Sequence, residues 1–428
     1  MIKVLLKGPI LSRSGYGEHS RFMYRGLASR PDLFDIYIHP VNWGQSSWDL
    51  NLKSGKDQKD IQKCIEKMHH FKGQFDLSLQ VLIPSEFENI ATKNIGVTAA
   101  VETTAASAMW INLANQMDRV FVTSEHAKKT LVNPTHHVKM ENDDNVYTIQ
   151  MQKPVTVVSY PYRDLGVSEK AIDKIKLDTK FNFVTSAQFG PRKNLMNTIK
   201  WFVEEFKDEE DDELVDKVHN MNNSQLDRQK MIIQLAQSVH SVPHRKCRVF
   251  LLHGNMTEDE MNSLYNHPNI HAYITATHGE GFGLPIFEAA CNGMPVVAPA
   301  WSGQVDFLYD DVKNERSGRV KRTPMFTKVK YKMDKVPKEA VWEHVIDAET
   351  EWCYPDEDSF KKALRNVKNV YKPKKLVAEQ LKVSLRENLD KEKMYELIVK
   401  EILEVCPEDM IELEGFFDSL EDELQVHE

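Results

Sequence analysis

Short apolar runs alternate with helix-like stretches twice along this chain, and this repeat restricts its fold more than any other feature. In the first series the apolar runs are residues 2–8, 34–41, 77–84, 94–102 and 118–124. In the second series they are residues 182–189, 247–254, 269–277 and 294–300. Apolar strands separated by helices are typical of parallel sheets covered by crossover helices. The sequence therefore predicts an α/β protein with two doubly wound, Rossmann-like units.

The stretches between these runs predict the helices and the domain limits. Apolar spacing predicts helices over residues 18–28, 194–206, 224–239, 258–265 and 285–292, and a long helical region from residue 359. Residues 133–153 lack periodicity, which predicts an exposed loop or hairpin. The acidic run DEEDDE, residues 208–213, is interpreted as a solvated helix end and not as a metal site. The expected domains are residues 1–170, residues 171–375, and a C-terminal helical region, 376–428, that packs back toward the first domain.

Charge, cysteine usage and hydropathy exclude several classes of protein. The first apolar run is interrupted by Lys3 and Lys7, which favours a strand over a signal peptide. Apolar runs of about 18 residues, which a membrane span requires, are absent. The five cysteines form no CxxC pair, as in a reduced intracellular protein without structural zinc. A net charge of −9 argues against bulk affinity for nucleic acid. We expect a cytoplasmic protein, in the host cytoplasm if the chain is viral.

The segment THGEGFGLPIFEAACNGMPVVAP, residues 277–299, carries the strongest functional pattern. Two glycines let the backbone approach a ligand, and a helix starting near Pro285 offers free N–H groups to an anion. Glu280 precedes this turn and Glu288 follows it, and a carboxylate accepts hydrogen bonds from sugar hydroxyls. The pattern indicates a phosphate-bearing ligand whose hydroxyls are held by two acids. The alternative for Glu288 is an ordinary solvated helix residue.

The run E-G-F-G-L-P-x-x-E-A-x-x-x-G-x-P-V-V resembles the donor-binding motif of glycosyltransferase family 4, retaining enzymes of the GT-B fold. The following segment, residues 300–308, is similar to the family's Gly-x-x-Asp segment. The resemblance implies two Rossmann-like domains facing a central cleft, with Glu288 on the ribose of a nucleoside diphosphate sugar and Glu280 on the donor sugar. It also implies that the sugar-phosphate lies against the backbone of Gly281, Phe282, Gly283 and Leu284.

A pair of adjacent cations, Arg192 and Lys193, follows the first apolar run of the second series. The family has an Arg and a Lys at similar positions, so the resemblance implies that this pair neutralises the diphosphate leaving group. The alternative is a solvated pair at a helix start, where the helix dipole disfavours cations. The resemblance further implies a family of enzymes that needs no bound metal, and uridine diphosphate as the nucleotide.

Two further segments fall at predicted strand ends in the first unit. Gly15 and Gly17 resemble the N-terminal glycine loop of the same enzymes, which approaches the donor phosphate and the acceptor; an ordinary turn is the alternative. Arg13 and His19 are secondary candidates beside them. Glu102 stands where related enzymes often carry a histidine, and it either binds the donor sugar or acceptor or caps the next helix. This departure leaves the catalytic base open.

The acceptor is the least constrained part of the prediction. The whole chain, especially KGPILSRSGYGEHSRF (residues 7–22) and LFDIYIHPVNWGQSSW (residues 33–48), resembles glycosyltransferases of T-even-like tailed phages and their marine relatives. Some such phages glycosylate hydroxymethylcytosine in their own DNA. Between Lys313 and Lys338, ten Lys and Arg oppose two acids, with Phe326 and Tyr331 among them, as a DNA-binding surface would require. A solvated loop is the alternative. A cell-surface glycan or lipid as acceptor, and a nucleotide-sugar-binding protein without transferase activity, also remain open.

Overall fold

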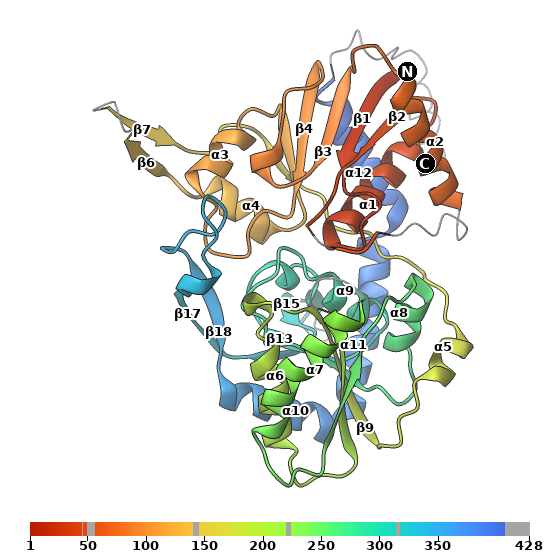
Figure 1. Cartoon of the computed structure of the whole chain (residues 1–428), viewed down its shortest axis with the longest axis vertical. Helices are drawn as coiled ribbons and strands as arrows, with labels where there is room; N and C mark the ends of the chain where they lie inside the picture. The colour runs from red at the N-terminus through yellow and green to blue at the C-terminus, as the bar shows by residue number, and fades with distance from the viewer. Residues whose placement is uncertain (45, 49–55, 140–144, 220–223, 314–316, 407–428) are drawn as a thin grey trace.

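The computed structural model describes residues 1–44, 46–48, 56–139, 145–219, 224–313 and 317–406, and it contains two α/β domains that face each other (Figure 1). The first domain has a six-stranded sheet of order β2-β1-β3-β4-β5-β8, in which every neighbouring pair is parallel. Its strands are β1 (Ile2–Gly8), β2 (Phe34–Pro40), β3 (Leu77–Val81), β4 (Lys93–Thr98), β5 (Arg119–Val122) and β8 (Val155–Val157).

The second domain repeats this plan with a six-stranded parallel sheet of order β11-β10-β9-β12-β13-β16. Its strands are β9 (Phe181–Gln188), β10 (Asp212–His219), β11 (Arg248–Leu252), β12 (Ala272–Ile274), β13 (Val296–Pro299) and β16 (Thr327–Val329). The prediction of two doubly wound units is therefore confirmed. The chain passes from the first sheet to the second between residues 157 and 181. The predicted domain limit at residue 170 falls within this connection and remains a proposal.

Helices cover both faces of each sheet, which is why a central strand such as β3 is buried along its whole length. Serine, threonine or aspartate caps many of their N-termini; Ser14, for example, accepts a hydrogen bond from the Gly17 N–H. The helices are α1 (Gly15–Ala28), α2 (Lys56–His70), α3 (Ala108–Ala114), α4 (Glu125–Val132), α5 (Glu169–Lys174), α6 (Leu195–Glu205), α7 (Gln225–His240), α8 (Glu258–Tyr265), α9 (Leu284–Cys291), α10 (Glu357–Asn369), α11 (Tyr371–Asn388) and α12 (Lys391–Leu403).

Three antiparallel pairs lie outside the two main sheets. They are β6 (His136–Lys139) with β7 (Val146–Ile149), β14 (Tyr309–Lys313) with β15 (Val320–Pro324), and β17 (Tyr331–Lys335) with β18 (Glu351–Pro355). The β6–β7 hairpin projects from the first domain (Figure 1), which confirms the hairpin expected within residues 133–153.

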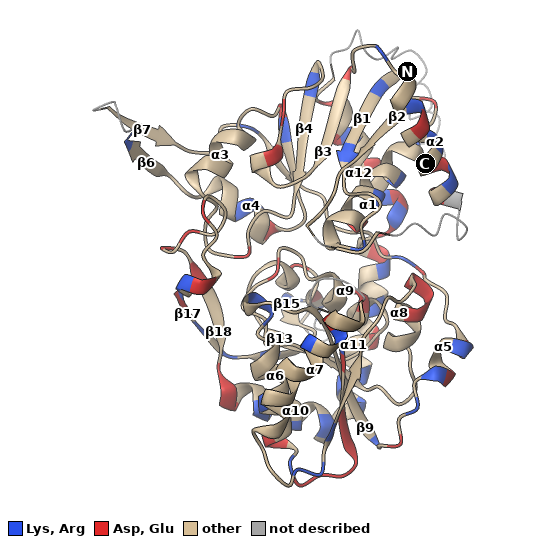
Figure 2. Cartoon of the chain, viewed as in Figure 1, with Lys and Arg blue, Asp and Glu red and all other residues tan. Residues whose placement is uncertain are grey.

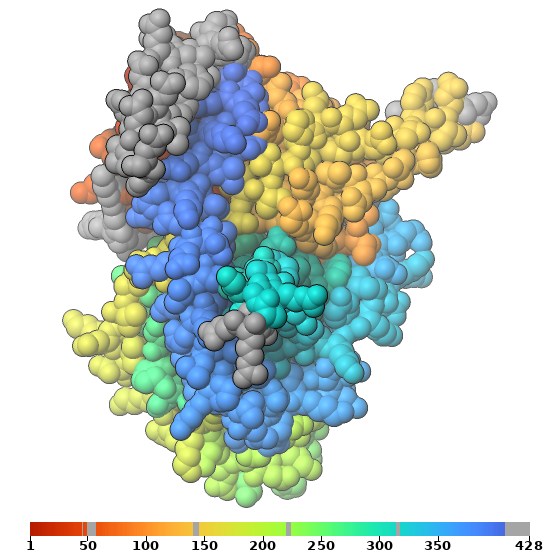
Figure 3. Space-filling view, turned by 180° about the vertical axis from the view of Figure 1, so that it is seen from behind, coloured from red at the N-terminus to blue at the C-terminus, as the bar shows by residue number. Residues whose placement is uncertain are grey.

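The C-terminal helices run along the back of both domains (Figure 3). Helix α11 packs on α9 of the second domain, and α12 packs on α1 of the first. The last residues of the predicted C-terminal region, 407–428, lie outside the described residues. Among the helices that the structure describes, none combines the length and the apolar character needed to cross a bilayer.

The interpretation of the acidic run as a solvated helix end fits residues 208–211, which follow α6 and are exposed or half-buried, but it is wrong for the last two residues. These two residues, Asp212 and Glu213, begin strand β10, and both side chains are buried. Lys368 lies 2.5 Å from the Asp212 carboxylate, and Thr179 donates a hydrogen bond to Glu213. The sequence DELVDKVH does not look like a strand, because the polar partners of its first two acids lie on α10 and in the segment just before β9.

Asp216, in the middle of β10, makes the stability of the protein depend on pH. Both of its carboxylate oxygens are buried without a hydrogen bond to any residue that the structure describes, and burial raises its pKa to about 8. Because this value exceeds the pKa of about 3.9 in an unfolded chain, the stabilisation is complete below that lower pKa and is lost as pH rises to 8.

We therefore expect Asp216→Asn to flatten the dependence of the free energy of unfolding on pH. Between pH 5 and 8 the wild-type protein should lose on the order of 2–4 kcal/mol more than the variant. Urea unfolding at each pH measures this difference. Asp173→Asn, on the exposed face of α5, is the matched control and should leave the slope unchanged. Equal slopes for the wild type and Asp216→Asn would contradict the assignment.

Candidate functional site

Glu280 is the centre of a buried group of charges at the edge of the second sheet. It follows β12 and is 6% exposed. The Lys193 ammonium lies 2.7 Å from both of its carboxylate oxygens, and Thr277 donates a third hydrogen bond at 2.9 Å. Arg192 donates from Nη1 to the same carboxylate at 3.1 Å and to the Gly279 carbonyl at 2.6 Å. Two cations that follow β9 thus meet an acid that follows β12.

The first domain adds Glu102 to this group. Arg192 Nη2 lies 3.1 Å from Glu102 Oε1, on the loop that follows β4. We name Glu102, Arg192, Lys193 and Glu280 the ionic cluster. The structure therefore brings together all four residues that the sequence predicts to be catalytic, across the boundary between the two domains.

The cations of the ionic cluster hold the Glu280 carboxylate in its charged form. Burial alone would raise the pKa of Glu280, but Lys193 and Arg192 lower it to about 2. Desolvation lowers the pKa of Lys193, although Glu280 opposes this effect. The two cations and two carboxylates balance in formal charge, and their mutual contacts fix the positions of the cations, which is how fixed charges stabilise negative charge developing nearby.

The glycines beside Glu280 shape the turn that leads into α9. Gly283 has a φ of +96°, which favours glycine, and it caps α9 at Leu284. A Cβ on Gly281 would lie 2.8 Å from the Ala99 carbonyl oxygen, so this glycine permits the close approach of the first domain. The Phe282 side chain is buried against Tyr160, Phe287 and Phe307.

The N-terminal glycine segment reaches the same turn. Helix α1 begins at Gly15, so Gly15 and Gly17 lie within its first turn rather than in a loop before it. The space beside Gly15 is open except for Leu284, whose side chain lies 3.9 Å from where a Cβ would stand. Gly17 is packed against the Ser12 carbonyl. The structure thus places Gly15 and Leu284 together, whereas Gly17 belongs to local packing.

Glu288 lies on α9 among residues that the sequence did not indicate. Its side chain is near Tyr265, and desolvation raises its pKa to about 7 against the opposing effect of Arg163. Arg163 in turn pairs with Glu18 at 2.5 Å and with Glu258 at 3.2 Å. Glu18 follows Gly15 and Gly17 in α1, and this proximity to the glycines is the only feature of the sequence that could have indicated it. Arg163 lies in the connection between the domains, where no motif indicates a functional residue.

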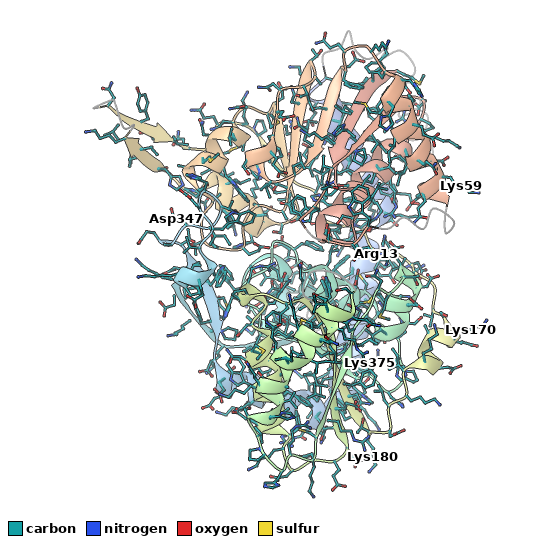
Figure 4. The ribbon with its side chains drawn as sticks, in the orientation of Figure 1. Arg13, Lys59, Lys170, Lys180, Asp347 and Lys375 are labelled. Carbon is teal, nitrogen blue, oxygen red and sulfur yellow. The ribbon has the colours of Figure 1, made fainter. Side chains whose placement is uncertain are left out.

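The two secondary candidates beside the glycines, Arg13 and His19, have different surroundings in the structure. Arg13 donates from Nη1 to the Met256 carbonyl at 3.0 Å, which joins the two domains at the cleft (Figure 4). His19 is 1% exposed, its ring packs on Tyr160, and burial lowers its pKa to about 3. His19 is therefore a core residue, and its secondary candidacy is wrong.

Direct contacts close the cleft on the side of α4. Ser124 donates to the Gly281 carbonyl at 2.6 Å, and the Glu125 N–H donates to Asp306 at 2.7 Å. A hollow of about 710 Å³ lies between β14 and α11; Asp306 and Phe307 of the Gly-x-x-Asp segment line it, but no member of the ionic cluster does. The Ser124 and Glu125 contacts thus hold the first domain against the turn at Gly281 and against Asp306.

The basic run from Lys313 to Lys338 forms strands β15, β16 and β17, not the solvated loop of the alternative interpretation. Phe326 is 7% exposed, so it cannot stack on a base, and this part of the prediction is wrong. Tyr331 is 37% exposed, and Lys328, Lys330 and Lys332 are exposed beside it. Residues 314–316 of the run lie outside the described residues. Basic and acidic residues are intermixed along most of the remaining ribbon (Figure 2).

The described part of the chain gathers no three His, Cys, Asp or Glu side chains in an arrangement that could hold a metal ion.

The fold is similar to that of several solved glycosyltransferases. HepE of Anabaena, solved with UDP and glucose, is 13% identical over 94% of this chain and 100% of its own, with a TM-score of 0.57. Sucrose-phosphate synthase of Thermosynechococcus elongatus is 12% identical over 94% and 99%, with a TM-score of 0.59. Trehalose-6-phosphate synthase is 10% identical over 95% and 100%, with a TM-score of 0.56.

Sequence comparison adds nothing to this likeness, since no family model and no curated protein matches the chain. At such low identity the structural likeness establishes the fold alone. Two facing domains with six-stranded parallel sheets, aligned over nearly the whole of these neighbours, show that the chain has the GT-B fold.

Proposed function

We propose that this protein is a retaining glycosyltransferase of family 4 that transfers a sugar from a nucleoside diphosphate sugar, with uridine diphosphate as the nucleotide. The observation that carries the proposal is the ionic cluster, in which both domains contribute charged side chains to one buried point of a GT-B cleft. Neighbours of the same fold bind UDP and UDP-glucose, which supports this choice of donor. The presence of Arg192, Lys193, Glu280 and Glu288 together favours transfer over binding alone.

In the proposed reaction, the bond between the anomeric carbon and the diphosphate oxygen breaks, and the negative charge grows on the leaving diphosphate. Arg192 and Lys193 neutralise that charge, and the backbone of Gly281 to Leu284 lies against the sugar-phosphate. Glu280 accepts hydrogen bonds from the donor sugar, and Glu102 fixes the Arg192 guanidinium. The acceptor hydroxyl forms the new bond on the same face of the sugar and gives its proton to the diphosphate. Glu288 holds the ribose hydroxyls.

The acceptor that we propose is hydroxymethylcytosine in phage DNA, modified in the cytoplasm of the host. The exposed lysines of β16 and β17 support this proposal, because cations that contact phosphates supply most non-specific affinity for DNA. Incubation with hydroxymethylated and unmodified DNA, followed by mass spectrometry of the digested nucleosides, tests it. A sugar mass increment on the modified base alone supports DNA as the acceptor. Nucleotide release only with a glycan acceptor would move the enzyme to cell-surface glycans.

Neutralising Lys328, Lys330 and Lys332 together should weaken DNA binding and reduce its salt dependence. If each lysine contacts one phosphate, the slope of log K against log salt should fall by up to about 3. The matched control replaces Lys59, Lys170 and Lys180, three exposed lysines on other faces (Figure 4). Fluorescence anisotropy from low to high salt measures both slopes. A slope equal to that of the control would exclude this surface as the DNA contact.

A further inference from the structure

Polar groups continue from Glu288 across the α8–α9 face of the second sheet, away from the ionic cluster. The Tyr265 hydroxyl is near both Glu288 and Ser186, and both residues influence its pKa. The hydroxyl is buried and makes no full hydrogen bond within the described residues. On β9, Ser186 is the register partner of Lys217 on β10. Glu288, Tyr265, Ser186 and Lys217 therefore form a continuous polar row, which we name the polar row.

Lys217 ends the polar row with a buried positive charge. It is 7% exposed, and its ammonium donates to the Gly254 carbonyl at 2.7 Å, just beyond the end of β11. An ammonium group has three N–H donors, and this carbonyl uses one of them. The neighbouring acid, Asp216, points to the opposite face of the sheet, because side chains alternate along a strand. Within the residues that the structure describes, Gly254 is the one hydrogen-bond partner of this ammonium, and its remaining N–H donors are available to a bound ligand, since a buried cation with so few partners is costly.

The order of the strands indicates which part of a bound nucleotide would lie near Lys217. Arg192 and Lys193 follow β9 and Glu280 follows β12, whereas β10 and β11 lie on the other side of β9. In the proposed function, which this inference assumes, the diphosphate lies at the two cations and the ribose at Glu288. The remaining part of the nucleotide, its base, then lies toward the ends of β10 and β11, where Lys217 and Gly254 meet.

We infer that Lys217 donates a hydrogen bond to an exocyclic carbonyl oxygen of the donor's base and thereby selects uracil or guanine over adenine. Uracil O4 and guanine O6 accept a hydrogen bond, whereas adenine carries an amino group at the corresponding edge. An amino group facing the ammonium would set donor against donor and leave both groups unsatisfied. A site built around a buried polar group rejects a ligand that cannot pair with it.

Calorimetric titration of the full-length protein with UDP, GDP and ADP tests this inference. The wild type should bind UDP or GDP at least tenfold more tightly than ADP. Lys217→Met should weaken binding of the preferred nucleotide about tenfold and leave ADP affinity within about threefold. Lys217→Arg, which keeps charge and donors, should retain the preference. Lys180→Met is the matched control, since Lys180 is exposed at the opposite end of β9, far from Arg13 and the cleft (Figure 4).

The outcomes separate the inference from the proposed function. If Lys217→Met weakens UDP, GDP and ADP equally, or changes none of them, the inference is wrong although the donor site stands. A wild-type preference for ADP also overturns it. If the wild type binds none of the three nucleotides, the proposed function itself fails. Thermal unfolding of each variant, compared with Lys180→Met, separates loss of binding from loss of folded protein.

Discussion

Replacing Glu280 with alanine should abolish sugar transfer, with kcat falling by roughly a thousandfold or more. Glu280 is the one residue of the ionic cluster that forms ion pairs with both cations, and in the proposed reaction the same carboxylate holds the donor sugar. Its removal leaves Arg192 and Lys193 free to shift, so the charge that should meet the leaving diphosphate is no longer fixed. Initial rates at saturating donor concentration measure the loss.

The same substitution disturbs a buried ion pair, so stability must be measured beside activity. Breaking such a pair costs about 3–5 kcal/mol. Glu280→Gln keeps the shape and removes the charge, and it should also lose most of its activity while remaining folded. Glu210→Ala, at an exposed carboxylate, is the matched control and should remain fully active. Full activity of folded Glu280→Ala would overturn the assignment of the site.

Arg192→Ala and Lys193→Ala should each lower kcat by about 10²–10³-fold, with a smaller effect on KM. Both cations are proposed to act on the charge that appears as the sugar–phosphate bond breaks, and charge that appears only in the transition state affects kcat most. Arg192→Lys should not restore activity. The guanidinium reaches Glu102 at 3.1 Å, Glu280 at 3.1 Å and the Gly279 carbonyl at 2.6 Å, and a single ammonium cannot keep this geometry.

The double variant distinguishes a shared function from two separate ones. Because Arg192 and Lys193 both bind Glu280, the combined loss in kcat should be smaller than the product of the two single losses. Lys200→Ala, on the exposed side of α6, provides the control. A loss confined to KM in every variant would show that the pair binds the donor without assisting departure of the diphosphate.

Local patterns were sufficient to predict the parts of the fold that place this site. The Thr257–Glu260 capping box and the apolar spacing after it define α8 over the predicted residues. The glycines around Glu280 signal the turn, which the φ of Gly283 confirms. Strand β10 was not predicted, because the partner of its first acid, Lys368, is more than 150 residues away. A run of charged residues suggests a solvated surface when the sequence is read locally, because partners that are distant in sequence cannot be recognised from it.

The surroundings of the predicted residues depend on the same long-range contacts. Gly281 was expected to approach a ligand, and the structure shows its close contact with Ala99 of the first domain. Arg163 reaches Glu18 and the vicinity of Glu288 from the connection between the domains, which has no motif. Lys217 meets Gly254 only because β10 and β11 are neighbours in the sheet. The residues that belong to a recognisable motif could be predicted from the sequence. The residues that reach the site only through tertiary contacts, such as Arg163 and Lys217, could not.

The central claim is that the ionic cluster breaks the sugar–diphosphate bond of a nucleotide sugar. Release of nucleoside diphosphate from a panel of nucleotide sugars, with hydroxymethylated DNA as acceptor, tests it most directly. The account predicts release from a UDP-sugar by the wild type and release reduced at least a hundredfold by Arg192→Ala. Equal release by the wild type and Arg192→Ala, or no release from any donor with either DNA or glycan acceptors, would contradict it.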